Sequence, residues 1–250
     1  MSLARDLKSF AVERGAHLFG VAPVERFEGA PRGHRPADLL PGAKSVVVVS
    51  IRLFQSCVDH PRISQGSEVI PEEALPRVQQ HFYRRTNYET VNWALQIVSH
   101  QIAYRLSELG HDVMPCPVTY YDGSLSSTVP GYFAPFSHRH AAVAAGLGTF
   151  GLNNLVLSPQ FGPRNRFNSV ITTAELEPSD MLEEPVCLGE SCRVCLDAWP
   201  ECFGEMRELE IAGKTFRMAR QFGCKANCGG GGCIRVCPVK QQIGRPEAAT

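Results

Sequence analysis

Ser45-Val-Val-Val-Val-Ser-Ile51 is a run of mostly β-branched residues with no charged interruption. Such a run is typical of a strand covered on both faces, because neither face alternates with polar side chains. Helices that could cover it are predicted over residues 3–16, about 78–109 and 139–145. The run therefore predicts a central strand in an α+β or α/β layered fold.

The longest predicted helix carries apolar residues at i+4 steps that would face the core. These are Ala94, Val98, Ile102 and Leu106, and we expect Trp93, Ile97 and Tyr104 to widen the same stripe. Further strands are predicted over residues 17–22 and 111–118, the latter at a sheet edge because of its prolines. Residues 154–158 and 167–173 are predicted to be two strands of one sheet.

The charge balance narrows the classes of partner. The 250 residues include 25 basic and 25 acidic side chains, so the formal net charge is zero. This balance argues against nucleic acid or an anionic membrane as a partner. The N-terminus shows no apolar signal core, and no run approaches the length that crosses a bilayer. We therefore expect a soluble, cytoplasmic protein whose thiols stay reduced.

Eight of the ten cysteines lie between residues 187 and 237. A reducing compartment disfavours disulfides, which leaves structural zinc and iron–sulfur clusters as metal-binding alternatives. Two-cluster ferredoxins carry three closely spaced cysteines followed by a more distant Cys-Pro. Cys233-x₃-Cys237-Pro238 matches the end of such a run, and Cys192-x₂-Cys195 matches its start. The pattern favours two 4Fe–4S clusters over zinc.

The ferredoxin pattern also predicts how the cysteines divide, because the last cysteine of a run ligates the other cluster. One cluster would take Cys187, Cys192, Cys195 and Cys237, and the other would take Cys202, Cys224, Cys228 and Cys233. The four glycines of residues 229–232 would let the main chain wrap closely around a bulky group. No function is assigned to Cys57 or Cys116.

Gly146-Leu-Gly-Thr-Phe-Gly151 matches the dinucleotide motif G-x-G-x-x-G. That motif needs a strand before it and a helix after it, so that a pyrophosphate meets a helix N-terminus. Here the predicted helix comes first and the strand follows. We therefore interpret the glycines as a helix end and a tight turn.

The segment from His140 to Leu157 resembles the epoxyqueuosine reductase family, which is related to the reductive dehalogenases. The predicted strand over 167–173 and the two cysteine groups that follow are part of the same resemblance. Residues 39–49 and 85–88 also look like family segments. The resemblance implies a nitroreductase-like core over residues 1–178, a ferredoxin-like two-cluster domain over 179–240 and a tail over 241–250. We expect a short member of this family, without the helical-repeat extension that many of these reductases carry.

The resemblance further implies that the two clusters pass electrons to a cobalamin in the core, for a reductive reaction on a small or nucleoside-like substrate. A soluble ferredoxin or flavodoxin would supply the electrons. The implied cofactor-binding residues are Arg139, His140, Gly146, Leu147, Gly148 and Asn154. The proton donor of the family falls at about Tyr132, with Tyr120, Tyr121 and Asp122 as substitutes in the same loop, and His138 and His140 could relay protons or be structural.

Three other functions remain open on the sequence. The core could bind a flavin instead of a corrinoid, since nitroreductase-like folds commonly do. The chain could be a non-catalytic electron carrier or a corrinoid-reducing partner of another protein. Zinc alone could fill the cysteine sites.

Overall fold

The computed structural model describes residues 2–118, 134–221 and 231–239. Its centre is a four-stranded antiparallel sheet in the order β1 (Leu18–Pro23), β2 (Ser45–Arg52), β6 (Asn165–Thr172) and β3 (Val113–Pro115). Val48 of β2 lies opposite Gly20 on one side and Ser169 on the other. The valine run is therefore an interior strand, as predicted, and the proline-containing β3 is at the edge.

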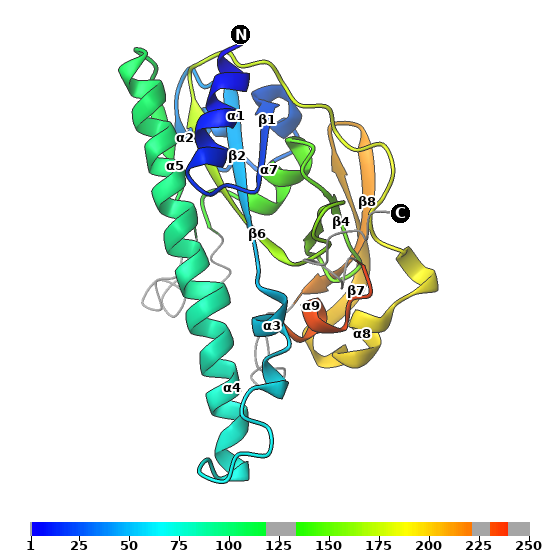
Figure 1. Cartoon of the computed structure of the whole chain (residues 1–250). Coiled ribbons are helices and arrows are strands. Elements are labelled where there is room, and N and C mark those ends of the chain that lie inside the picture. The colour runs from blue at the N-terminus through cyan, green and yellow to red at the C-terminus, as the bar shows by residue number, and fades with distance from the viewer. Residues whose placement is uncertain (1, 119–133, 222–230, 240–250) are drawn as a thin grey trace, which may run out of the picture.

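Both faces of the sheet are covered. Val47 and Val49 face a core that they share with α1 (Leu3–Glu13) and α5 (Val91–Glu108). Val46 and Val48 face a second core that includes α7 (His138–Ala144). Figure 1 shows this order of layers, with α1 and α5 on one side of the strands and α7 on the other. The predicted mixed helix and strand fold is confirmed, and its sheet is antiparallel.

A long helical rod runs along one side of the molecule (Figure 1). It consists of α4 (Leu75–Tyr83), a π-helical segment η4 (Arg84–Thr90) and α5. Its core stripe includes Val98, Ile102 and Leu106 as predicted, together with Leu95.

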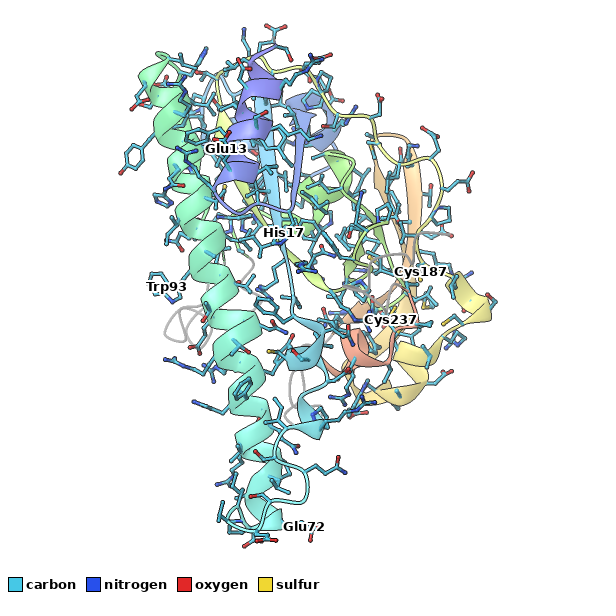
Figure 2. All side chains as sticks on the ribbon, viewed as in Figure 1. Glu13, His17, Glu72, Trp93, Cys187 and Cys237 are labelled. Atoms are coloured by element: carbon cyan, nitrogen blue, oxygen red, sulfur yellow. The ribbon has the colours of Figure 1, made fainter. Side chains whose placement is uncertain are left out.

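The prediction that three further residues widen this stripe is wrong. Trp93 is 68% exposed, and Ile97 and Tyr104 are also exposed. Trp93 points away from the sheet in Figure 2. At 100° per residue these positions fall on the side of the helix away from Leu95, so only the stripe on the sheet side is buried.

The prediction that residues 154–158 and 167–173 share one sheet is also wrong. The first segment contributes β5 (Val156–Leu157), which pairs with β4 (Thr149–Phe150) in a separate two-stranded ribbon. A bridge between Ser158 and Gly162 then turns the chain before β6 begins. The ribbon lies beside the main sheet and provides one wall of the candidate site below.

A hairpin that the sequence analysis did not predict separates the two cysteine groups. Its strands are β7 (Phe203–Ile211) and β8 (Lys214–Gln221). The connecting residues Ala212 and Gly213 both have positive φ, 49° and 77°, as a tight two-residue hairpin turn requires. Phe216 and Met218 join the second core, so the hairpin packs on the same layer as α7.

The remaining elements are short. They are α2 (Pro36–Leu39), α3 (Gln55–Val58), α8 (Val194–Ala198), α9 (Gly232–Val236) and the 3₁₀ turns Val24–Phe27, His60–Arg62, Glu72–Ala74, Gly189–Ser191 and Pro200–Cys202. Within the described ranges, none of the helices has the length and apolar character that crossing a bilayer requires.

Candidate metal centre

Four cysteines from two separate segments line a single pocket. Cys187, Cys192 and Cys195 come from the segment around α8, and Cys237 follows α9. Leu152 and Leu157, together with Pro238 and Val239, line the same pocket. Cys187 and Cys237 lie close together in Figure 2. These are the four residues that the ferredoxin pattern, in which the last cysteine of a run ligates the other cluster, assigns to one cluster.

The local backbone explains how the thiols reach the pocket. Arg193, between Cys192 and Cys195, has φ 47°, a left-handed conformation that is uncommon outside glycine. Its guanidinium donates a hydrogen bond of 2.6 Å to Glu190, which holds the bend from which both flanking cysteines face the pocket. Cys237 is extended, with φ −66° and ψ 123°, as a residue before proline is expected to be.

The thiols are placed where their ionised forms repel one another. Burial, and then the nearby charges of Cys187 and Cys237, raise the pKa of Cys195 to about 11. Burial also raises the pKa of Cys237, while the Val239 N–H and the Arg164 charge act in the opposite direction. Grouped, desolvated thiolates are stable only beside positive charge, and bound metal ions supply it.

The number and type of side chains in the pocket match the four thiolates that a 4Fe–4S cluster takes. In the described part of the chain, no three Cys, His, Asp or Glu side chains converge as ligands of a single metal ion. The four thiols line a pocket instead. Beside it, a Cβ on Gly151 would stand 2.7 Å from Cδ1 of Leu157, so glycine lets this pocket-lining leucine pack against the main chain. The donor set therefore fits a 4Fe–4S cluster.

Half of the second predicted cysteine set lies in the described residues. Cys202 is buried at the end of a 3₁₀ turn, and Cys233 is half-buried in α9. Trp199 joins the two segments, because its indole packs so closely on Gly232 that a Cβ there would stand 2.6 Å from Nε1. Cys224 and Cys228 lie outside the described residues.

The predicted cofactor residues of the core lie in the first turn of α7, just after that helix and at Asn154, which Arg139 contacts. Arg139 donates to the carbonyl oxygen of Asn154 at 2.5 Å, and Gln221 Oε1 lies 3.5 Å from the same nitrogen. His140 Nδ1 lies 2.6 Å from the Ser137 hydroxyl. Burial, followed by the charges of Arg139 and Arg207, lowers the pKa of His140 to about 4. His140 is therefore neutral at physiological pH.

The glycines of the G-x-G-x-x-G match are packed against the main chain. Gly146 follows α7 with φ 71°, and a Cβ on it would stand 1.9 Å from the Asp180 carbonyl oxygen. A Cβ on Gly148 would stand 2.4 Å from the Leu157 carbonyl oxygen, and Leu147 between them is buried. A helix precedes the motif, and β4 begins inside it at Thr149, so the predicted helix end and tight turn at Gly146 are confirmed.

Among the predicted proton donors and relays, His138 and His140 are the ones that the described residues include. Tyr132 and its substitutes Tyr120, Tyr121 and Asp122 lie outside the described residues. His138 is held within the protein, with Nδ1 3.0 Å from the Ser169 hydroxyl and Nε2 2.8 Å from the Pro117 carbonyl oxygen.

Sequence reasoning missed Arg164, which precedes β6 and is fully buried. Its guanidinium donates to the carbonyl oxygens of Arg235, Cys237 and Val239. No local pattern marks it, because a Gly-Pro-Arg-Asn stretch is typical of an exposed turn.

No family model matches the chain. Among curated proteins, tetrachloroethene reductive dehalogenases from Desulfitobacterium hafniense and Dehalobacter restrictus are 34% and 36% identical to it over 107 residues. That match covers 42% of this chain and 16% of each dehalogenase.

Two groups of solved structures share the fold. The catabolic reductive dehalogenase NpRdhA is 14% identical with a TM-score of 0.57, over 95% of this chain and 32% of that protein. The epoxyqueuosine reductase from Streptococcus thermophilus is 18% identical with a TM-score of 0.53, over 81% of this chain and 54% of that protein. The resemblance inferred from the sequence is thus confirmed for the fold. The comparisons give no support to the prediction that nucleic acid is not a partner.

Proposed function

We propose that this chain is an iron–sulfur oxidoreductase that delivers electrons from two 4Fe–4S clusters to an acceptor in its core, for a reductive reaction. The observation that carries the proposal is the single pocket lined by Cys187, Cys192, Cys195 and Cys237. The fold that the chain shares with reductive dehalogenases and epoxyqueuosine reductases supports the reductive class. When bound, the clusters would supply one-electron transfer.

The position of the cysteine pocket supports transfer into the core. Leu152 and Asn153 line the pocket, and the next residue, Asn154, accepts the hydrogen bond from Arg139 of α7. A single turn therefore contacts the thiols on one side and the predicted cofactor residues on the other. The peptide bond from Asn153 to Asn154 and the hydrogen bond from Arg139 therefore link the pocket to the layer that contains α7.

The second cluster would take Cys202 and Cys233 together with Cys224 and Cys228. Its support in the structure is Trp199, which packs on Gly232 beside Cys233. The Nε1–H of Trp199 is buried and has no acceptor among the described residues. A buried donor normally has a partner, and a cluster sulfur is an acceptor that would suit this one.

For the acceptor in the core, residues 1–178, we propose a corrinoid of the cobalamin type. Three of the residues that the resemblance implies for it, Arg139, Gly146 and Gly148, contact the chain's own main chain. The proposal is supported by the resemblance of residues 140–157 to the epoxyqueuosine reductase family and by the dehalogenase similarity. The substrate we propose is small or nucleoside-like, with Tyr132 as its proton donor.

The test is a joint analysis of protein produced, purified and supplied with cobalamin without oxygen. Iron and acid-labile sulfide should appear in equal amounts, about eight of each per chain, with cobalt retained after gel filtration. Zinc in the absence of sulfide would mean that the cysteines bind structural zinc and not clusters. Flavin retained in place of cobalt would mean that the acceptor in the core is a flavin. Fast electron exchange with no turnover of any substrate would make the chain a carrier.

A further inference from the structure

Arg164 is the largest side chain among the fully buried residues of the described structure. A guanidinium keeps its charge at every physiological pH, and burying that charge is costly unless an anion compensates it. Burial lowers the pKa of Arg164, while the charges of Cys237 and Asp59 raise it. The buried cation therefore raises the question of which anion balances it.

The hydrogen bonds of Arg164 all point to the C-terminal cysteine segment. Nη1 donates to the Val239 carbonyl oxygen at 3.1 Å, and Nη2 donates to the carbonyl oxygens of Cys237 at 3.1 Å and Arg235 at 3.3 Å. The main chain of Arg164 belongs to the sheet layer, where its carbonyl oxygen accepts from Leu53 N–H at 2.9 Å. One residue thus fixes the Cys237 segment to the core.

Carbonyl oxygens accept from Nη1 and Nη2 of Arg164, while its Nε–H is buried with no acceptor among the described residues. None of these contacts neutralises the charge of the guanidinium. Among the ion pairs of residues 2–118, 134–221 and 231–239, none includes Arg164. Of the two anions that would stabilise the guanidinium, the Cys237 thiolate would act more strongly than the Asp59 carboxylate. Cys237 lines the pocket with three further thiols, so a ligated, thiolate-bound cluster would be the main counter-charge.

We propose that Arg164 is a positioning residue for Cys237 and that its fixed positive charge raises the reduction potential of the cluster held in the pocket of Cys187, Cys192, Cys195 and Cys237. The inference rests on the proposed function. A nearby cation stabilises the state with the extra electron more than the oxidised state, because the reduced cluster carries more negative charge. Burial strengthens this effect, since solvent screens little there.

The test compares Arg164→Gln and Arg164→Met, which remove the charge, with Arg164→Lys, which keeps it. Arg26→Gln is the matched control, because Arg26 also donates to two main-chain carbonyls, those of Ala144 and Ser179, neither of which lines the cysteine pocket. The reconstituted holoproteins are analysed for iron and sulfide and titrated electrochemically, with the two cluster signals followed by electron paramagnetic resonance.

One of the two signals should shift to a more negative midpoint potential in the Gln and Met variants and shift less in the Lys variant. Both signals should stay unchanged in Arg26→Gln. Iron loading by the Lys variant but not by the neutral variants would support the same charge requirement. A neutral variant with full iron content and unshifted midpoint potentials would overturn the inference. An equal loss of iron in the Gln, Met and Lys variants would overturn it as well. Wild-type protein without sulfide would overturn the proposed function itself.

Discussion

Gly162 lies against the main chain of Val239, where a Cβ on the glycine would stand 2.4 Å from the carbonyl oxygen. Gly162 belongs to the turn before β6, and Val239 lies two residues after Cys237. Together with the Arg164 hydrogen bonds, this contact seats the last cysteine segment on the core. The two regions can approach this closely because position 162 has no side chain.

Gly162→Ala should therefore displace the Cys237 segment. Gly33→Ala is its control, because both glycines have positive φ, 55° and 89°, and a Cβ on Gly33 would have no neighbour within 4 Å among the described residues. Both variants should lose about 1 kcal/mol from the unfavourable backbone conformation. Only Gly162→Ala should also lose iron after anaerobic reconstitution. Thermal unfolding by circular dichroism and iron analysis measure the two effects, and equal iron in both variants would argue against this docking contact.

A second prediction concerns which face of α5 contributes to the stability of the fold. Leu95 is fully buried and Trp93 is 68% exposed, two positions earlier on the same helix. Leu95→Ala should lower the free energy of unfolding by about 2–5 kcal/mol, as for other buried leucines. Trp93→Ala should change it by less than about 0.5 kcal/mol. Urea unfolding measures both values, and a large loss for Trp93→Ala would mean that its face of α5 is covered.

Because several histidines are buried, we expect the free energy of unfolding to fall in acid. Burial and the charges of Arg139 and Arg207 lower the pKa of His140 from 6.5 to about 4, so the unfolded chain binds a proton at a higher pH than the folded chain does. Stability is therefore lost as the pH falls from about 6.5 towards 4. Between pH 7.5 and 5 the loss from this residue should be on the order of 2 kcal/mol.

The matched variant for this prediction is His140→Asn, which cannot gain a proton. Its free energy of unfolding, measured in urea at several pH values, should fall less steeply with acid than that of the wild type. Some slope should remain, because burial also lowers the pKa values of His138 and His17. Identical slopes in variant and wild type would show that His140 is not the residue that titrates.

The central strand and the turn after α7 could be predicted from the sequence because local patterns decide them. The unbroken valine run has no polar face, which leaves only an interior position for β2. The order of helix, glycines and strand around Gly146 excludes a phosphate loop without any tertiary information. The structure lines one pocket with the four cysteines that the ferredoxin pattern assigns to one cluster, and their role as ligands stays a prediction.

Other features depended on contacts between distant segments. Two apolar stripes compete on α5, and only the position of the sheet decides that Leu95 is buried and Trp93 is exposed. The burial of Arg164 depends on acceptors 71 to 75 positions later in the chain. The β7–β8 hairpin did carry a local signal, since apolar residues alternate with polar ones at Leu209, Ile211, Phe216 and Met218 around Ala212-Gly213. The pattern was overlooked because the cysteines on either side favoured a metal-binding interpretation of the whole region.

The most direct test of the central claim is to count iron and sulfide in oxygen-free wild-type protein, Cys195→Ala and Cys57→Ala. Cys195 lines the four-thiol pocket, and Cys57 does not. We predict about eight iron atoms and eight sulfides in the wild type and in Cys57→Ala, and about four of each in Cys195→Ala. Wild-type protein without sulfide, or Cys195→Ala with an undiminished content of both, would contradict the assignment of this pocket to a 4Fe–4S cluster.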